Sequence, residues 1–160
     1  MGDETKIVPI SPQDSEFFYR EGYLMLPGLL KEDFNQRLMD ELDEMVHHRT
    51  NGDHRMVVSY PEMGLLTSYP PIMDVVGQLM DGKHFAMHHI HAVRQDAGAQ
   101  GVYWHQDYEQ LPQTNRSHLM VHVFYYLNGL NGEVGDLLVL PCSQDRIVAR
   151  DAMMSFGTED

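Results

Sequence analysis

The sequence predicts an α+β fold in which helices come first and an antiparallel β sandwich or barrel follows. Two observations predict it. Residues 11–82 contain segments with helical periodicity and capping signals, whereas residues 85–160 contain short alternating segments separated by Gly, Asn and Pro. That spacing is typical of antiparallel sheets rather than of parallel strand-helix units. The 160 residues contain no linker or internal repeat, so we expect a single domain over residues 1–160.

Three helices are expected in the first part. Residues 12–22 begin with proline after a serine N-cap and end at a glycine, which are helix start and stop signals. Residues 72–81 lie between two prolines and a glycine and are amphipathic. Residues 31–49 show the clearest periodicity, because their apolar side chains recur at helical spacing on one face. That apolar stripe consists of Phe34, Leu38, Leu42, Met45 and Val46.

Six strands are expected from alternation and from the turn residues that bound each segment. Two of them fall in the helical part of the chain and four in the β-rich part. They are Tyr23–Leu26, Met56–Tyr60, Phe85–Gln95, Val102–Asp107, His118–Leu127 and Leu137–Leu140.

Net charge and cysteine content restrict the class of protein. The chain carries a formal charge of −13 and has no cluster of Lys and Arg, which argues against nucleic acid or an anionic membrane surface as a partner. Its one cysteine, Cys142, excludes an intramolecular disulfide and fits a reducing compartment. Residues 1–9 are acidic and lack an apolar segment, so we expect no secretory signal peptide. No apolar run is long enough to span a membrane, and we expect a cytoplasmic protein.

The ten histidines carry most of the functional argument. Residues two apart in a strand share a face, so His105 and Asp107 can point at one ion. A third histidine would complete a two-His, one-carboxylate triad, which leaves positions open on Fe(II). Alone, a His-x-Asp motif more often marks a surface histidine beside an acid.

The surrounding pattern makes the motif specific. A Gly-rich approach with Gly98 and Gly101 leads to Trp104–Tyr108, and an apolar strand and an Asn-Gly turn precede Gly135–Ser143. Together with Phe17–Leu30, these segments resemble the phytanoyl-CoA dioxygenase family, and the similarity runs from about Phe17 to Ser143. That family comprises Fe(II)- and 2-oxoglutarate-dependent oxygenases built on a double-stranded β-helix, a jelly roll with helices packed outside.

By this resemblance, His105 and Asp107 would be the first two iron ligands, and Gln106 would contact the cosubstrate. The implied cofactors are Fe(II) and 2-oxoglutarate, and the implied reaction is hydroxylation of a small organic substrate. The protein would supply the ligand geometry, a shielded pocket and the placement of the substrate.

Two departures from the family pattern stand out. The family's Pro-Gly-Ser-His turn is here Pro141–Gln144, in which Cys142 occupies a position where glycine reaches backbone angles that cysteine resists. The family's distal histidine and its 2-oxoglutarate-binding arginine lie well downstream of that turn. No histidine follows His122, and Arg146 and Arg150 come too early to be that arginine. We therefore expect an incomplete jelly roll, the N-terminal portion of the catalytic domain.

Several alternatives remain open. His122, four residues from His118 on a predicted strand, is a substitute for the third iron ligand. His89 and His91 share a strand face while His88 points to the other, so an ideal strand cannot bring all three to one ion. The alternative to an oxygenase is a non-catalytic jelly-roll protein that binds a metal or a small ligand at a degenerate iron site. Open sheet edges also predict self-association, which would bring a ligand from a second chain.

Overall fold

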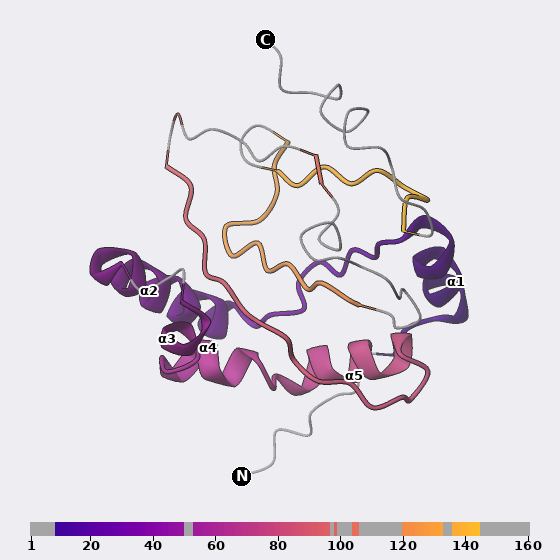
Figure 1. Ribbon diagram of the computed structural model, residues 1–160, viewed down its shortest axis with the longest axis horizontal. Coiled ribbons are helices and arrows are strands. Elements are labelled where there is room, and N and C mark those ends of the chain that lie inside the picture. Colours follow the sequence, from indigo (N-terminus) through magenta and orange to yellow (C-terminus); the bar gives the residue numbers. More distant parts are fainter. Residues whose placement is uncertain are drawn as a thin grey trace. The chain divides into compact units, whose positions relative to one another are not determined.

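The computed structural model describes residues 9–49, 53–96, 98, 104–105, 120–132 and 136–144 (Figure 1). The chain divides into two compact units. The first comprises residues 1–11, 25–95 and 123–130, and the second comprises residues 12–24, 96–122 and 131–160. The helices are α1 (Pro12–Glu21), α2 (Glu32–His48), α3 (His54–Val57), α4 (Pro61–Leu66) and α5 (Pro70–Leu79). α1 belongs to the second unit and the other four helices to the first.

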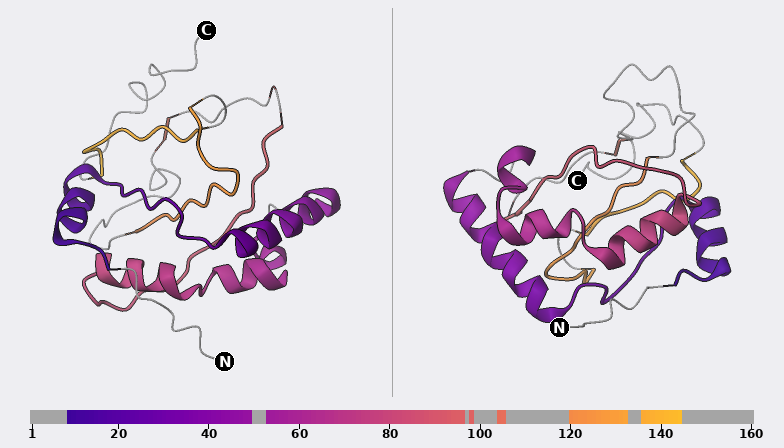
Figure 2. Two further views of the ribbon diagram at one scale, coloured as in Figure 1. Left: turned by 180° about the vertical axis from the view of Figure 1, so that it is seen from behind. Right: turned by 90° about the horizontal axis from the view of Figure 1, so that it is seen from below.

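The longest helix, α2, confirms the prediction for residues 31–49. Its stripe faces inward: Phe34, Leu38 and Met45 are buried, and Leu42 packs against them. Arg49 ends the helix with a φ of 58°, a left-handed conformation typical of helix C-termini. The same face packs against α4 (Figure 2), whose Met63 and Leu66 are buried. The hydrophobic periodicity therefore located both the helix and its buried side.

The short helix α4 was not predicted from the sequence, and its N-terminus is capped from α2. Tyr60, at the N-cap position, makes no capping bond through its side chain. Instead the backbone N–H groups of Glu62 and Met63 donate to the two carboxylate oxygens of Glu41, at 2.9 and 2.8 Å. A carboxylate there satisfies two N–H groups that lack a partner within the helix and opposes the positive end of the helix dipole.

The strand predicted at Met56–Tyr60 is wrong, because this region contains α3 and a turn. Asp53 precedes the helix and acts as its cap: its Oδ1 accepts from the Arg55 backbone N–H at 2.9 Å. Hydrogen bonding to the Arg55 side chain and then to its backbone lowers the pKa of Asp53 to about 2. Only Val57 of the predicted strand is buried, which suits one turn of helix touching the core.

α1 and α5 confirm the other two predicted helices with small changes at their ends. α5 starts at Pro70 rather than residue 72, because its two prolines fit the first helical turn, where the missing N–H groups cost nothing. It ends before Asp81 and Gly82, which have φ values of 55° and 67°. Its buried side chains are Ile72, Val75, Val76 and Leu79.

Two extended segments of the first unit lie against the helices. In Figure 1, residues 83–96 run back across α5 and the α3–α4 region as an extended chain. Ile90 and Ala92 from this segment, and Tyr125 and Leu127 from residues 123–130, pack on the buried cluster of α2, α3 and α4. Asn35 donates to the Leu127 carbonyl at 2.9 Å, and Arg94 pairs with Asp43 at 2.9 Å. Alternate residues thus face the helices.

The predicted β-rich part stays a prediction. Within the described part of the chain, no residue is assigned to a hydrogen-bonded strand, and this includes Tyr23–Leu26, Phe85–Gln95 and Leu137–Leu140. Most of Val102–Asp107 and part of His118–Leu127 lie outside the described residues.

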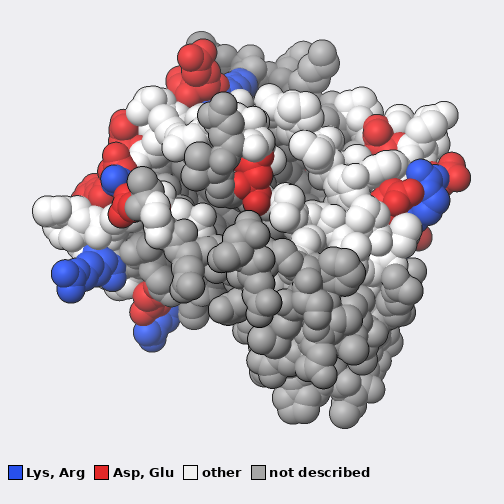
Figure 3. All heavy atoms as spheres, turned by 90° about the horizontal axis from the view of Figure 1, so that it is seen from above, with Lys and Arg blue, Asp and Glu red and all other residues white. Residues whose placement is uncertain are grey.

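Charged residues on the described surface are dispersed. On the face drawn in Figure 3, basic side chains lie beside acidic ones rather than forming a patch of their own. The structure also pairs Arg37 with Asp33 and with Glu62, both at 3.0 Å. Among the residues that the structure describes, no helix is long and apolar enough to cross a membrane.

The Glu41 cap predicts a specific loss of stability. Glu41→Ala removes both bonds to the α4 backbone and should lower the free energy of unfolding by about 1–2 kcal/mol in urea titrations. Glu44→Ala, which alters an exposed residue of the same helix, is the control and should change it by less than about 0.5 kcal/mol. Equal effects of the two substitutions would show that the cap contributes nothing.

Tyr125 predicts a dependence of stability on alkaline pH. Burial raises the pKa of Tyr125 to about 12, above the value of about 10 in an unfolded chain. Between these values the unfolded chain loses the phenolic proton and the folded one keeps it, so stability falls as pH rises. The free energy of unfolding, measured with urea at about pH 9 and at about pH 12, should therefore fall between the two pH values. In Tyr125→Phe this fall should be smaller by about 1–3 kcal/mol. An unchanged pH dependence would contradict the assignment.

Candidate metal centre

The predicted iron ligands are only partly within the described residues. Trp104 and His105 are described, with the tryptophan half-buried and the histidine exposed. Gln106 and Asp107 lie outside the described residues, so the geometry of the His-x-Asp pair stays a prediction. Upstream, Gly98 has a φ of 82°, a backbone conformation that favours glycine, and it fits the Gly-rich approach to the motif.

His122, the substitute for the third ligand, is also exposed. Both His105 and His122 interact with other residues of the structure. Among the described residues, no three His, Cys, Asp or Glu side chains converge in a geometry that could hold a metal ion. Because Asp107 is not among them, the predicted triad is neither assembled nor contradicted by this observation.

The histidines of residues 88–91 depart from ideal strand geometry. His89 and His91 share an exposed side, as predicted, with ring centroids 4.9 Å apart. The expectation that His88 points away is wrong: its ring lies 4.8 Å from that of His89, and their Nδ1 atoms are 2.5 Å apart. The backbone here is irregular, so adjacent side chains are not forced to opposite faces.

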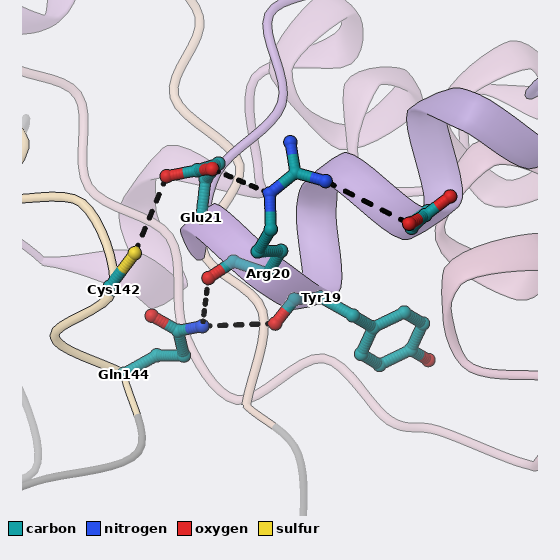
Figure 4. A network of polar contacts seen from close by, with 6 residues as sticks. Tyr19, Arg20, Glu21, Cys142 and Gln144 are labelled. Carbon is teal, nitrogen blue, oxygen red and sulfur yellow. Dashed lines mark hydrogen bonds and ion pairs between the residues drawn. The ribbon is translucent and has the colours of Figure 1, made fainter.

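The turn Pro141–Gln144 docks on the C-terminus of α1 (Figure 4). The Gln144 side-chain amide donates to the carbonyls of Tyr19 and Arg20, at 3.0 and 3.1 Å. The Cys142 backbone N–H donates to the carbonyl of Glu21 at 2.9 Å. Three successive carbonyls at the end of the helix, which lack partners within it, are thereby satisfied by a turn more than 120 residues away.

Cys142 has a left-handed backbone conformation, which is unusual for a residue with a side chain. Its φ is 59°, in the left-handed region. Its thiol donates to the Glu21 carboxylate at 3.4 Å, and Arg20 pairs with the same carboxylate at 2.7 Å (Figure 4). Hydrogen bonds from Arg20 and then from Cys142 hold the pKa of the Glu21 carboxyl below its usual value. These contacts fix the turn on the helix despite the unfavourable φ.

The role of Gln144 was missed by the sequence reading, which treated it only as a departure from the family's histidine. A partial signal was present in Gly22, which we read as the end of a helix. The structure gives this glycine a second reason: at its φ of 88°, a Cβ would lie 2.6 Å from Oε1 of Gln144. A side chain at position 22 would therefore displace the Gln144 amide from its present position.

Comparison with known proteins identifies a family. The family model described as Phytanoyl-CoA dioxygenase (PhyH) matches residues 18–158, which is most of the chain. No curated protein and no solved structure matches the sequence. The matched range contains the His105–Asp107 segment, His122 and the turn Pro141–Gln144.

Two glycines allow the docking of the turn to be tested against backbone strain alone. Gly22→Ala and Gly28→Ala both place alanine at positive φ, which costs about 1–2 kcal/mol. Only Gly22→Ala also collides with Gln144, since nothing lies within 4 Å of a Cβ at Gly28. We expect Gly22→Ala to cost about 1–2 kcal/mol more in urea unfolding, the value of the displaced hydrogen bonds.

A double-mutant cycle checks the cause. The effects of Gly22→Ala and Gln144→Ala should be less than additive, because each removes the same contacts. The effects of Gly28→Ala and Gln144→Ala should add. Additivity in both cycles would rule out the docking contact as the reason for the larger cost.

Proposed function

Because the chain belongs to the phytanoyl-CoA dioxygenase family, we propose that it binds Fe(II) and 2-oxoglutarate and hydroxylates a small organic substrate. The observation that carries this proposal is the family match over residues 18–158, within which the His105-Gln106-Asp107 motif stands. The family generally uses this pair of cofactors. The substrate class goes no further than a small organic molecule, because one fold accommodates many substrates.

The donor set fits the metal. An imidazole and a carboxylate, with positions left open for other ligands, suit non-haem Fe(II). His105 is exposed, so its ring is accessible to an ion. We propose His105 and Asp107 as protein ligands, with His122 as the candidate for the third.

Each residue has a distinct task in this proposal. His105 binds the ion through an unprotonated ring nitrogen, so protons compete with the metal and binding weakens in acid. Asp107 binds as a carboxylate and reduces the net charge of the centre. The amide of Gln106 can donate to a carboxylate oxygen of 2-oxoglutarate. When bound, iron and 2-oxoglutarate supply the dioxygen chemistry that hydroxylates a C–H bond and yields succinate and carbon dioxide.

We also propose that the β-rich part forms a double-stranded β-helix with helices outside. The alternation in the first unit supports this proposal. Tyr125 and Leu127 face the helical core, whereas Phe124 and Tyr126 are exposed. Extended segments that bury one face against helices leave the other face for the interior of a jelly roll.

Metal binding by substituted chains tests the ligand assignment. Anaerobic calorimetric titration of the metal-free chain with Fe(II) should show binding that His105→Ala and Asp107→Ala each weaken by about tenfold or more. His84→Ala, which alters another exposed histidine, is the control and should leave it unchanged. Retained affinity in both ligand variants would exclude this motif as the iron site. A similar loss in His122→Ala would assign the third ligand.

Succinate formation tests the activity separately. With Fe(II), 2-oxoglutarate and dioxygen, we expect succinate to form, and we expect Gln106→Ala to raise the KM for 2-oxoglutarate while leaving the affinity for Fe(II) unchanged. Iron binding through His105 without any succinate would contradict the oxygenase and favour a binding protein with a degenerate centre. Analytical ultracentrifugation of the active sample shows whether a second chain takes part in the site.

A further inference from the structure

Two adjacent histidines in the first unit face each other through their ring nitrogens. The rings of His88 and His89 lie 4.8 Å apart, nearly perpendicular at 78°, and their Nδ1 atoms are separated by 2.5 Å. Both side chains are exposed. His91 lies beside them, with its ring 4.9 Å from that of His89. Three imidazoles are therefore gathered on one exposed stretch of four residues.

The contact between the Nδ1 atoms limits what the pair can hold. In a neutral imidazole one ring nitrogen carries a proton and the other an exposed lone pair. Two Nδ1 atoms at this distance cannot both present lone pairs to each other, so one must donate its proton to the other. The alternative is that both lone pairs point at one cation lying beside the line that joins them.

We propose that His88 and His89 bind one divalent transition-metal ion, Zn(II) or Cu(II), through their two Nδ1 atoms. Imidazole nitrogen suits these ions, whereas Mg(II) and Ca(II) prefer oxygen ligands. Zn–N bonds of about 2.0–2.1 Å at tetrahedral angles need the two nitrogens about 3.3 Å apart. Exposed side chains can separate by that small amount through rotation about χ1 and χ2.

The protons balance without an external base. Both Nδ1 atoms must be unprotonated to bind the ion, so each ring carries its one proton on Nε2. The proton that lay between the two Nδ1 atoms moves through water to the Nε2 of its own ring. Metal binding to the neutral pair therefore releases no proton, whereas binding to a protonated pair releases one.

Water completes the coordination. Among the described residues, no group of three His, Cys, Asp or Glu side chains can hold a metal ion as they stand, so the site is an open one with two protein ligands. The exposure of both side chains leaves room for water. The pair belongs to the first unit, whereas His105 belongs to the second. This inference therefore does not depend on the proposed iron centre.

The chain contains a matched control for this site. His47 and His48 are also adjacent and exposed, and their rings pack edge to face at 5.1 Å at the end of α2. Calorimetric titration with Zn(II) uses the metal-free His105→Ala/Asp107→Ala chain, in which the proposed iron centre cannot bind the ion. It should show one binding event that His88→Ala/His89→Ala abolishes. The corresponding substitutions at His47 and His48 should leave that event intact. His91→Ala should change its affinity by less than about threefold, because the ring at position 91 is not a ligand.

A spectroscopic measurement separates this site from the iron centre. In the His105→Ala/Asp107→Ala chain loaded with one equivalent of Cu(II), the electron paramagnetic resonance spectrum should show coupling to two nitrogens. The further His88→Ala/His89→Ala substitution should abolish it. An unchanged spectrum, or Zn(II) binding that survives the loss of both histidines, would overturn the proposal.

Folding of the variants is checked by thermal melts followed by circular dichroism. Because both side chains are exposed, their loss should leave the melting temperature nearly unchanged. If the double variant does not fold, His88→Asn and His89→Asn are measured singly. Each should weaken Zn(II) binding by about tenfold or more, and wild-type affinity in both would equally overturn the proposal.

Discussion

The first unit depends on burial of the apolar stripe of α2. Leu38 and Met45 have no exposed surface, and burying each contributes roughly 1.5–3 kcal/mol before entropic costs. Other parts of the unit attach to the same helix through polar contacts: Glu41 caps α4, Asn35 holds residue 127, and Asp43 pairs with Arg94. The exposed ion pair between Arg94 and Asp43 contributes little to the free energy of unfolding. The apolar contacts therefore supply most of the stability of this unit, and the polar contacts fix the positions of the segments on α2.

In the second unit the corresponding constraint is the docking of the Pro141–Gln144 turn on α1. The three carbonyls that end the helix find their donors in this turn, and Gly22 leaves the space that the Gln144 side chain occupies. The turn holds Cys142 at a positive φ, and its hydrogen bonds to α1 offset the cost of that conformation. The hydrogen bonds thus join the turn Pro141–Gln144, near the C-terminal end of the range that matches the family, to α1, at the N-terminal end of that range.

Imidazole chemistry connects the proposed function and the further inference, although different residues carry them. The motif at His105 pairs an imidazole with a carboxylate, a donor set that suits Fe(II) and leaves open positions for a cosubstrate. The pair at His88 and His89 offers nitrogen alone, which favours Zn(II) or Cu(II). Ligand type therefore distinguishes the two proposed metal sites, and metal competition experiments must resolve both.

The sequence by itself determined the features that depend on neighbouring residues. The stripe of α2, the proline start of α5 and the glycine end of α1 follow from local periodicity and capping, and the structure confirms them. The family was also readable from the His105–Asp107 motif in its context, and the family match confirms it. The jelly roll and the iron ligands remain predictions. Only the tertiary structure showed α4 capped by Glu41, the turn held by Gln144, and His88 turned toward His89. The first two contacts join residues that are far apart in the chain. The third occurs where the backbone is irregular and side chains do not alternate as in a strand. Neither kind of contact produces a periodic pattern in the sequence, so neither could be predicted from it.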